Sequence, residues 1–127
     1  MTVIQLRVPA QPEFVGLVRS TTTAVLARTQ VSYDDALEWP LAIDEAFALV
    51  INHQPPSGDV LIDYQIEDGQ VEIKLTGPSG STAADLEKEV CQWGWNILTA
   101  AVPNSVFWLT DEGAISVSLN SRVVASA

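Results

Sequence analysis

The segment from Leu41 to His53 is the longest stretch of this chain with a clear helical periodicity, and it constrains the fold most. Its apolar residues, together with the tryptophan just before it, recur at the i, i+3, i+4, i+7 spacing of a buried stripe: Trp39, Ala42, Ile43, Ala46, Phe47 and Val50. This spacing predicts a helix packed against a core. Pro40 fits the first turn of such a helix, so the polar residues 32–38 are predicted to form a connector.

One flank of this helix carries a carboxylate and a histidine. Glu45, Leu49 and His53 lie four residues apart, so they follow one another along the helix surface. Carboxylates avoid apolar surroundings unless something pairs with them, which makes Glu45 a candidate functional residue. The simpler alternative is a surface acid beside a broad apolar stripe, with His53 as a cation near the negative end of the helix dipole. The spacing alone leaves both interpretations open.

Composition limits the classes of function. The formal net charge of −10 over 127 residues argues against nucleic acid as a direct partner and suits either a basic protein partner or simple solubility. Cys91 is the only cysteine and His53 the only histidine, so neither an intrachain disulfide nor a zinc site, nor any other metal site, is expected. The sequence has no apolar run of membrane-spanning length and no signal peptide, so we expect no membrane partner and a cytoplasmic location.

The remaining segments predict a mixed α/β architecture. Strands are expected over residues 3–8, 59–66, 70–76, 105–109 and 114–119, and helices over 13–29 and 81–101 as well as the central segment. A tight turn is expected at 67–69. The element order predicts an α/β (α+β) two-layer sandwich, in which a mixed, mostly antiparallel five-stranded sheet carries three helices on one face. Residues 1–122 are predicted to form a single domain and residues 123–127 a loose tail.

A family resemblance follows from the central helix. Leu-Ala-Ile-Asp is followed by Glu45-Ala46 and, seven residues after the alanine, by His53. This pattern resembles the N-box helix of the anti-sigma factor serine kinases. These belong to the GHKL (Bergerat-fold) superfamily, so the resemblance implies a histidine kinase-like ATPase fold. It also implies the general-base position for Glu45. The family's magnesium-binding Asn position is Leu49, which offers no oxygen to a hard cation, and Asn52 lies seven residues from Glu45 rather than four.

A second family motif is also altered. Thr76-Gly-Pro-Ser-Gly80 stands where the family has Asp-x-Gly-x-Gly, so Thr76 takes the adenine-reading Asp position, Pro78 replaces a glycine and Gly80 remains. The resemblance implies that His53, Thr76 and Gly80 belong to a degenerate nucleotide site, whereas a plain hairpin exit is the alternative from the residues alone. No cofactor is expected. ATP with magnesium would be a cofactor only if the degenerate site still binds nucleotide. The indoles of Trp93 and Trp95 are expected to fill space that phosphates need.

The resemblance implies a regulatory role. The predicted function is an anti-sigma factor-like regulator that acts as a homodimer and binds a sigma factor, a STAS-type anti-anti-sigma partner, or both, without being an active enzyme. The alternatives are an active ATP-dependent serine/threonine kinase and an unrelated small interaction domain. The predicted partner surface contains Arg19 and the acidic residues within 34–38 and 85–89.

Overall fold

We analysed a computed structural model of the chain, which describes residues 1–51, 58–90 and 93–121. His53, Cys91 and the predicted tail 123–127 lie outside these residues, so the predictions for them stay predictions. In chain order the described elements are β1 (Thr2–Pro9), the 3-10 helix η1 (Pro12–Phe14), α1 (Val15–Leu26), α2 (Tyr33–Ile51), β2 (Asp59–Glu67), β3 (Gln70–Thr76), α3 (Ala83–Val90), α4 (Trp93–Ala101), β4 (Val106–Leu109) and β5 (Ile115–Asn120).

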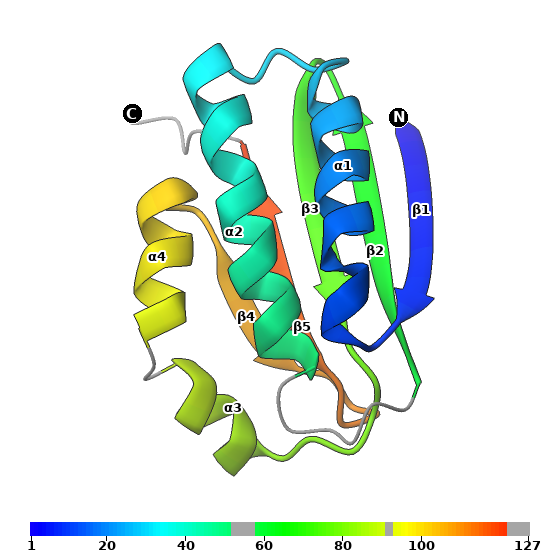
Figure 1. The fold of residues 1–127 in the computed structure, drawn as a ribbon, viewed down its shortest axis with the longest axis vertical. Coiled ribbons are helices and arrows are strands. Elements are labelled where there is room, and N and C mark those ends of the chain that lie inside the picture. The colour runs from blue at the N-terminus through cyan, green and yellow to red at the C-terminus, as the bar shows by residue number, and fades with distance from the viewer. Residues whose placement is uncertain (52–57, 91–92, 122–127) are drawn as a thin grey trace.

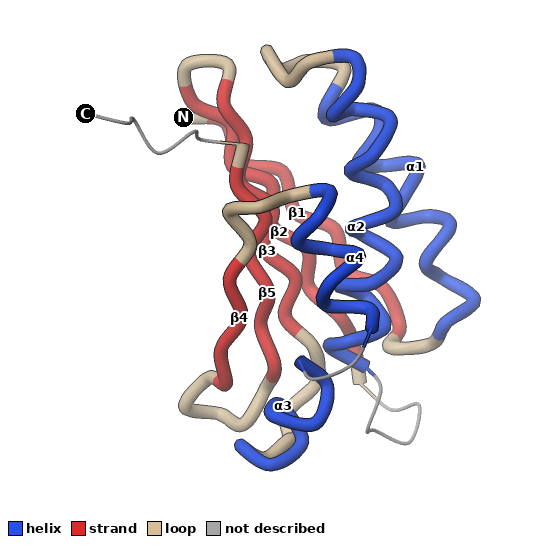
Figure 2. The backbone as a smooth tube through the Cα atoms, turned by 90° about the vertical axis from the view of Figure 1, so that its left-hand side faces the viewer, coloured by secondary structure: helices blue, strands red, loops and turns tan. Residues whose placement is uncertain are grey.

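The elements form two layers, as predicted. A five-stranded sheet with the order β1-β2-β3-β5-β4 makes one layer, and the helices lie on one of its faces (Figures 1 and 2). All four strand pairs are antiparallel, so the sheet is antiparallel throughout rather than mixed. The segment predicted as one helix over 81–101 contains two, α3 and α4, which raises the number of described α-helices from three to four. α2 lies between α1 and α4 (Figure 1), and its interface with α4 is larger than its interface with α1.

Alternation along the strands places the core between the layers. Alternate residues of the three central strands face the core, and nine of them are at most 1% exposed: Val60, Ile62, Tyr64, Val71, Ile73, Leu75, Ile115, Val117 and Leu119. The core-facing side of α2 supplies the other half of the core, including the stripe predicted from the sequence. Because the side-chain period of a strand is two, the residues between them lie on the outer face of the sheet.

α2 begins two turns earlier than predicted. Residues 33–38 are helical rather than a connector, and Pro40 lies inside the helix rather than in its first turn. Ser32 explains the early start: its hydroxyl accepts a hydrogen bond from the Asp35 N–H at 3.1 Å, and its carbonyl accepts one from the Ala36 N–H at 2.8 Å. Such a cap, followed by acids in the first turn, stabilises a helix N-terminus. Burial of Trp39, 3% exposed, then holds the helix through the proline.

The β2–β3 hairpin follows its sequence signal. Asp68 and Gly69 have φ values of 53° and 77°, the pair of positive values that a two-residue type I′ turn requires. The turn also supports the helical layer, because the Gln30 N–H donates a 2.8 Å hydrogen bond to the Gly69 carbonyl. The predicted hairpin at 67–69 is therefore confirmed, and it anchors the connection between α1 and α2.

A buried hydrogen bond ties α1 to the sheet. The hydroxyl groups of Thr22 and Tyr64 lie 2.9 Å apart, and the Thr22 hydroxyl also donates to the Val18 carbonyl at 2.8 Å. Thr22 therefore donates along its own helix and accepts from the Tyr64 O–H, so both buried hydroxyls are satisfied. Burial raises the pKa of the Tyr64 phenol above its ordinary value.

The described residues contain no helix that is both long enough and apolar enough to cross a membrane.

Candidate functional site

Glu45 lies in the contact between α2 and α4. The carboxylate is half-buried, and a methyl group built on Gly94 would overlap its Oε2 atom. Glycine at this position of α4 therefore lets the carboxylate lie against the α4 backbone. The residue in the family's general-base position thus faces a neighbouring helix, not open solvent.

Leu49, one turn after Glu45, is part of the hydrophobic core. Only 5% of its surface is exposed, and it contributes to the same cluster as Ala46 and Val50. The position that corresponds to the family's magnesium ligand therefore carries a buried hydrocarbon side chain. Carbon and hydrogen atoms cannot replace the oxygen ligands that magnesium requires.

Thr76 lies on the far face of the sheet from α2. It is paired across the strands with Ser116, and the two hydroxyl oxygens are 2.9 Å apart. Its strand neighbour Leu75 is fully buried on the helix-facing side, so Thr76 shares the outer face with Lys74. The structure therefore does not bring the Thr76 side chain towards Glu45.

Gly77, which sequence reasoning passed over, is the residue of this turn that approaches α2. It is buried, and a methyl group built on it would overlap the carbonyl oxygen of Val50. Val50 lies five residues after Glu45, which is about 140° around an α-helix. The turn thus packs under the core side of α2, while Glu45 points towards α4. The alternation of Val71, Ile73 and Leu75 was the signal that placed Gly77, and not Thr76, on this side.

The backbone of the turn is bonded to the β4–β5 hairpin. The Gly77 N–H donates to the Ile115 carbonyl at 3.0 Å, and the N–H groups of Gly80 and Ser81 both donate to the Gly113 carbonyl, at 3.0 and 2.8 Å. Three of the four N–H groups in residues 77–81 are therefore bonded within the protein, since Pro78 has none. A glycine-rich turn can hold phosphate only through N–H groups that point at the ligand.

The two tryptophans flanking Gly94 occupy different environments. Trp93 is 76% exposed, whereas Trp95 packs edge-to-face against Phe107 of β4 with ring centroids 4.7 Å apart. Gly94, between the two indoles in sequence, lies against Glu45. The expectation that both indoles fill the space that phosphates need stays a prediction.

The residues of the predicted partner surface do not form one patch. Arg19 of α1 is bonded to Asp44 of α2, with Nε and Oδ1 2.8 Å apart. The acids in the first turn of α2 and those of α3 lie at opposite ends of the molecule (Figure 1). Asp85 also caps α3, because it accepts from the Thr82 N–H at 2.9 Å and its own N–H donates to the Thr82 hydroxyl at 3.2 Å.

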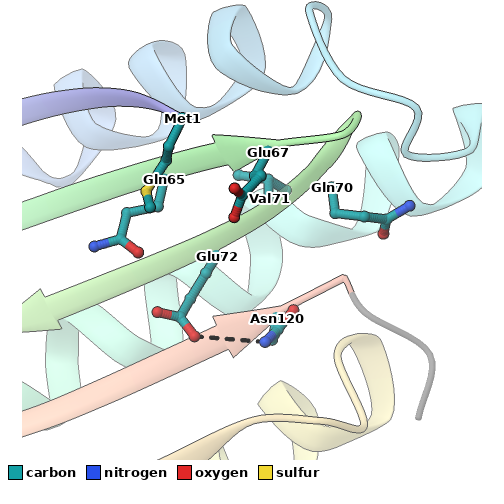
Figure 3. A pocket seen from close by; sticks show the side chains of 7 residues that line it. All are labelled: Met1, Gln65, Glu67, Gln70, Val71, Glu72 and Asn120. Atoms are coloured by element: carbon teal, nitrogen blue, oxygen red, sulfur yellow. Dashed lines mark hydrogen bonds between the residues drawn. The ribbon is translucent and has the colours of Figure 1, made fainter. Parts of the chain in front are cut away.

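Three pockets of the described residues lie away from Glu45, Thr76 and Gly80. The first opens on the outer face of the sheet and has a volume of about 190 Å³; its lining residues, drawn in Figure 3, include Glu72 bonded to Asn120 at 3.4 Å. A second, of about 360 Å³, lies beside Trp39, and a third, of about 160 Å³, beside Phe47. Within the described ranges no three His, Cys, Asp or Glu side chains are grouped so that they could hold a metal ion.

Comparison with known proteins identifies relatives over most of the chain. Residues 8–95 match the family described as the histidine kinase-like ATPase domain. The serine-protein kinase RsbW of Oceanobacillus iheyensis is 34% identical over 88 residues, which is 67% of this chain and 54% of that protein. The RsbW of Bacillus subtilis is 28% identical over 89 residues, or 68% of this chain and 56% of that protein. The chain thus spans about half the length of these relatives.

A solved structure has the same fold. The crystal structure of the RsbU and RsbW domains of Rv1364c from Mycobacterium tuberculosis matches 96% of this chain and 32% of that one, with a TM-score of 0.70 and 17% sequence identity. This likeness confirms the predicted histidine kinase-like ATPase fold. Together with the family match over residues 8–95, it shows that the chain belongs to the histidine kinase-like ATPase domain family.

Proposed function

We propose that this protein is an anti-sigma factor-like regulator that acts by binding other proteins, with a nucleotide site that has lost most of its affinity for Mg-ATP. Relatives named serine-protein kinase RsbW support the regulatory assignment. The proposed partners are a sigma factor and a STAS-type anti-anti-sigma factor, and the proposed assembly is a homodimer.

The observation that carries the loss of nucleotide affinity is the bonding of the 77–81 turn. Three of its four N–H groups donate to Ile115 and Gly113, so a phosphate would have to break those bonds to gain its own. Leu49 adds to this, because a buried leucine cannot hold magnesium. The proposed degenerate site keeps Glu45, Gly80 and, in sequence, His53.

An active serine/threonine kinase is the second candidate. Two observations favour it: Glu45 is retained and half-buried, and the relatives are named as serine-protein kinases. A kinase needs bound Mg-ATP, so nucleotide affinity separates the two candidates.

We expect no saturable Mg-ATP binding at micromolar concentrations. Each lost charge-assisted contact is worth about 1.5–3 kcal/mol, so two such losses weaken binding by about a hundredfold or more. The exposed indole of Trp93, next to Gly94 and hence near Glu45, gives a fluorescence signal for the titration. Saturable quenching by micromolar Mg-ATP that disappears in Glu45→Ala, or transfer of phosphate to a STAS-type protein, would support the kinase instead.

Binding to a sigma factor is expected to weaken as salt rises. An acidic regulator attracts a basic surface, and this attraction falls between about 0.05 and 0.5 M salt because the Debye length shortens. The double change Asp34→Lys, Asp35→Lys at the start of α2 should slow association. Glu87→Lys tests the acids of α3, whereas Asp85 is unsuitable for reversal because it caps that helix.

A charge-matched control separates local from overall electrostatics. Asp111→Lys with Glu112→Lys changes the net charge equally, at exposed positions in the turn between β4 and β5. Biolayer interferometry against a panel of sigma factors should give slower association for the α2 variant than for this control. A panel without any binder, or a complex indifferent to both salt and the α2 changes, would contradict the proposed partner.

A further inference from the structure

An apolar ridge runs along the solvent side of α2. Tyr33, Leu37 and Leu41 follow one another at four-residue spacing and are 78%, 59% and 57% exposed. Side chains four residues apart on a helix have Cβ atoms about 6 Å from each other, so the three form a continuous strip, here called the α2 ridge. None of the three belongs to the hydrophobic core or packs against it. Exposed apolar residues that are contiguous, rather than scattered, mark an interaction surface.

Acidic side chains border the α2 ridge. α2 contains five acidic residues and no lysine or arginine over residues 33–51. Asp34 and Asp35 lie in its first turn, where they also stabilise the helix N-terminus. Glu38 lies beyond the first turn, is exposed, and has no such role. Asp44, further along, is already bonded to Arg19. The charge that α2 itself contributes beside the ridge is therefore negative.

We propose that the α2 ridge docks a basic amphipathic helix of a partner protein. The inference rests on the proposed protein-binding role and names the part of the partner that this surface recognises. A partner helix whose leucines recur at i, i+3, i+4 and i+7 can pack these leucines against the α2 ridge. Lysines or arginines that flank the leucines then lie close to Asp34 and Glu38.

Two other occupants are disfavoured by the same charges. A second copy of the chain would bring two acid-bordered ridges together, and an anionic membrane surface would meet the same repulsion. The α2 ridge also starts at the opposite end of α2 from the Gly77 turn, so a partner can occupy it whatever the nucleotide site does (Figure 1).

The test uses two synthetic peptides of identical composition. In the first, leucines lie on one face of a helix and lysines on the flanks; in the second, the same residues are scrambled so that no apolar face exists. Titrated into the isotopically labelled protein, the first peptide should shift the backbone NMR signals of residues 33–41, and the scrambled peptide should shift them weakly. Equal binding of the two peptides would overturn the proposal, because only charge would then be recognised.

A matched pair of variants locates the binding surface. Leu37→Glu with Leu41→Glu should weaken binding of the first peptide by at least about tenfold, since one buried leucine contributes about 1.5 kcal/mol or more and 1.4 kcal/mol is tenfold. Leu17→Glu is the control, because Leu17 is 52% exposed on α1 and equally apolar. Circular dichroism checks folding, and Leu37→Gln with Leu41→Gln replaces the glutamate pair if that pair unfolds.

The outcomes separate this inference from the function it rests on. An equal loss in Leu17→Glu, or no loss in the ridge variants, would overturn the ridge as the docking site. Sedimentation that shows a dimer in the native protein and a monomer in the ridge variants would assign the ridge to a second copy and overturn the proposed occupant. A sigma-factor panel without binders would remove the proposed function while leaving a positive peptide result in place.

Discussion

Replacing Gly77 with alanine is expected to destabilise the fold by about 3 kcal/mol, at the upper end of the range for overpacking in a core. The added methyl group would overlap the carbonyl oxygen of Val50, which belongs to the α2 backbone and cannot rotate away as a side chain could. Either α2 or the turn must shift. A shift of the turn would also strain the 3.0 Å bond from the Gly77 N–H to Ile115. Urea unfolding followed by circular dichroism measures the change in the free energy of unfolding.

Gly16→Ala is the matched control for this change. Gly16 lies in α1, and a methyl group built on it meets only the end of the Arg19 side chain, at 4.0 Å. Because alanine favours a helix over glycine by up to about 1 kcal/mol, this variant should be slightly more stable than the native protein. If Gly77→Ala unfolded at the same urea concentration as Gly16→Ala, the close packing of the turn against α2 would be wrong.

The two layers of the fold could be predicted because the signals for each helix and strand lie within a few residues of one another in the sequence. Strict alternation in β2 and β3 fixes which residues face the helices, and Asp68-Gly69 fixes the turn between them. The buried stripe of α2 likewise follows from helical spacing alone. These features depend on residues within one element or on two adjacent elements, so no long-range contact had to be known.

The start of α2 was mispredicted because two local signals conflict. Pro40 is typical of a first helical turn, whereas Ser32 and the following acids are typical of an N-cap. The cap prevails because the first turns of the helix also bury Trp39 and part of Ala36. The gain from this burial is a property of the tertiary structure, and it outweighs the hydrogen bond that a proline inside a helix cannot make.

The candidate site could be predicted only in part. The sequence pointed to Glu45 and Leu49 through spacing, and both lie on α2 as expected. It did not reveal that Glu45 lies against Gly94, because α2 and α4 are distant in sequence and only their packing brings the two residues together. The assignment of Thr76 followed a motif alignment, whereas the pleat of β3 turns Gly77 towards the helices.

Leu49→Asn is expected to cost about 3–5 kcal/mol of folding stability. The change replaces the two buried methyl groups of leucine with the oxygen and nitrogen of an amide of almost the same shape. It loses apolar burial worth about 0.8 kcal/mol per methyl group, and it leaves an amide without a partner among Ala46, Val50 and their apolar neighbours, which costs about 1–3 kcal/mol more. Leu41→Asn is the control on the same helix, because Leu41 is 57% exposed and its loss should cost less than about 1 kcal/mol. Thermal and urea unfolding of both variants measure the difference.

Leu49→Asn also tests whether residues other than Leu49 contribute to the proposed loss of nucleotide binding. Leu49→Asn restores the amide oxygen that the family offers to magnesium, so an otherwise intact site would bind Mg-ATP again. A ligand at a hundred times its dissociation constant stabilises the folded state by about 2.7 kcal/mol. We expect no such gain for Leu49→Asn with millimolar Mg-ATP, because three of the four N–H groups of the 77–81 turn remain bonded to Gly113 and Ile115. A rise in melting temperature that requires both magnesium and ATP would show that Leu49 alone blocks the site, and the protein would then be one substitution away from a nucleotide-binding state.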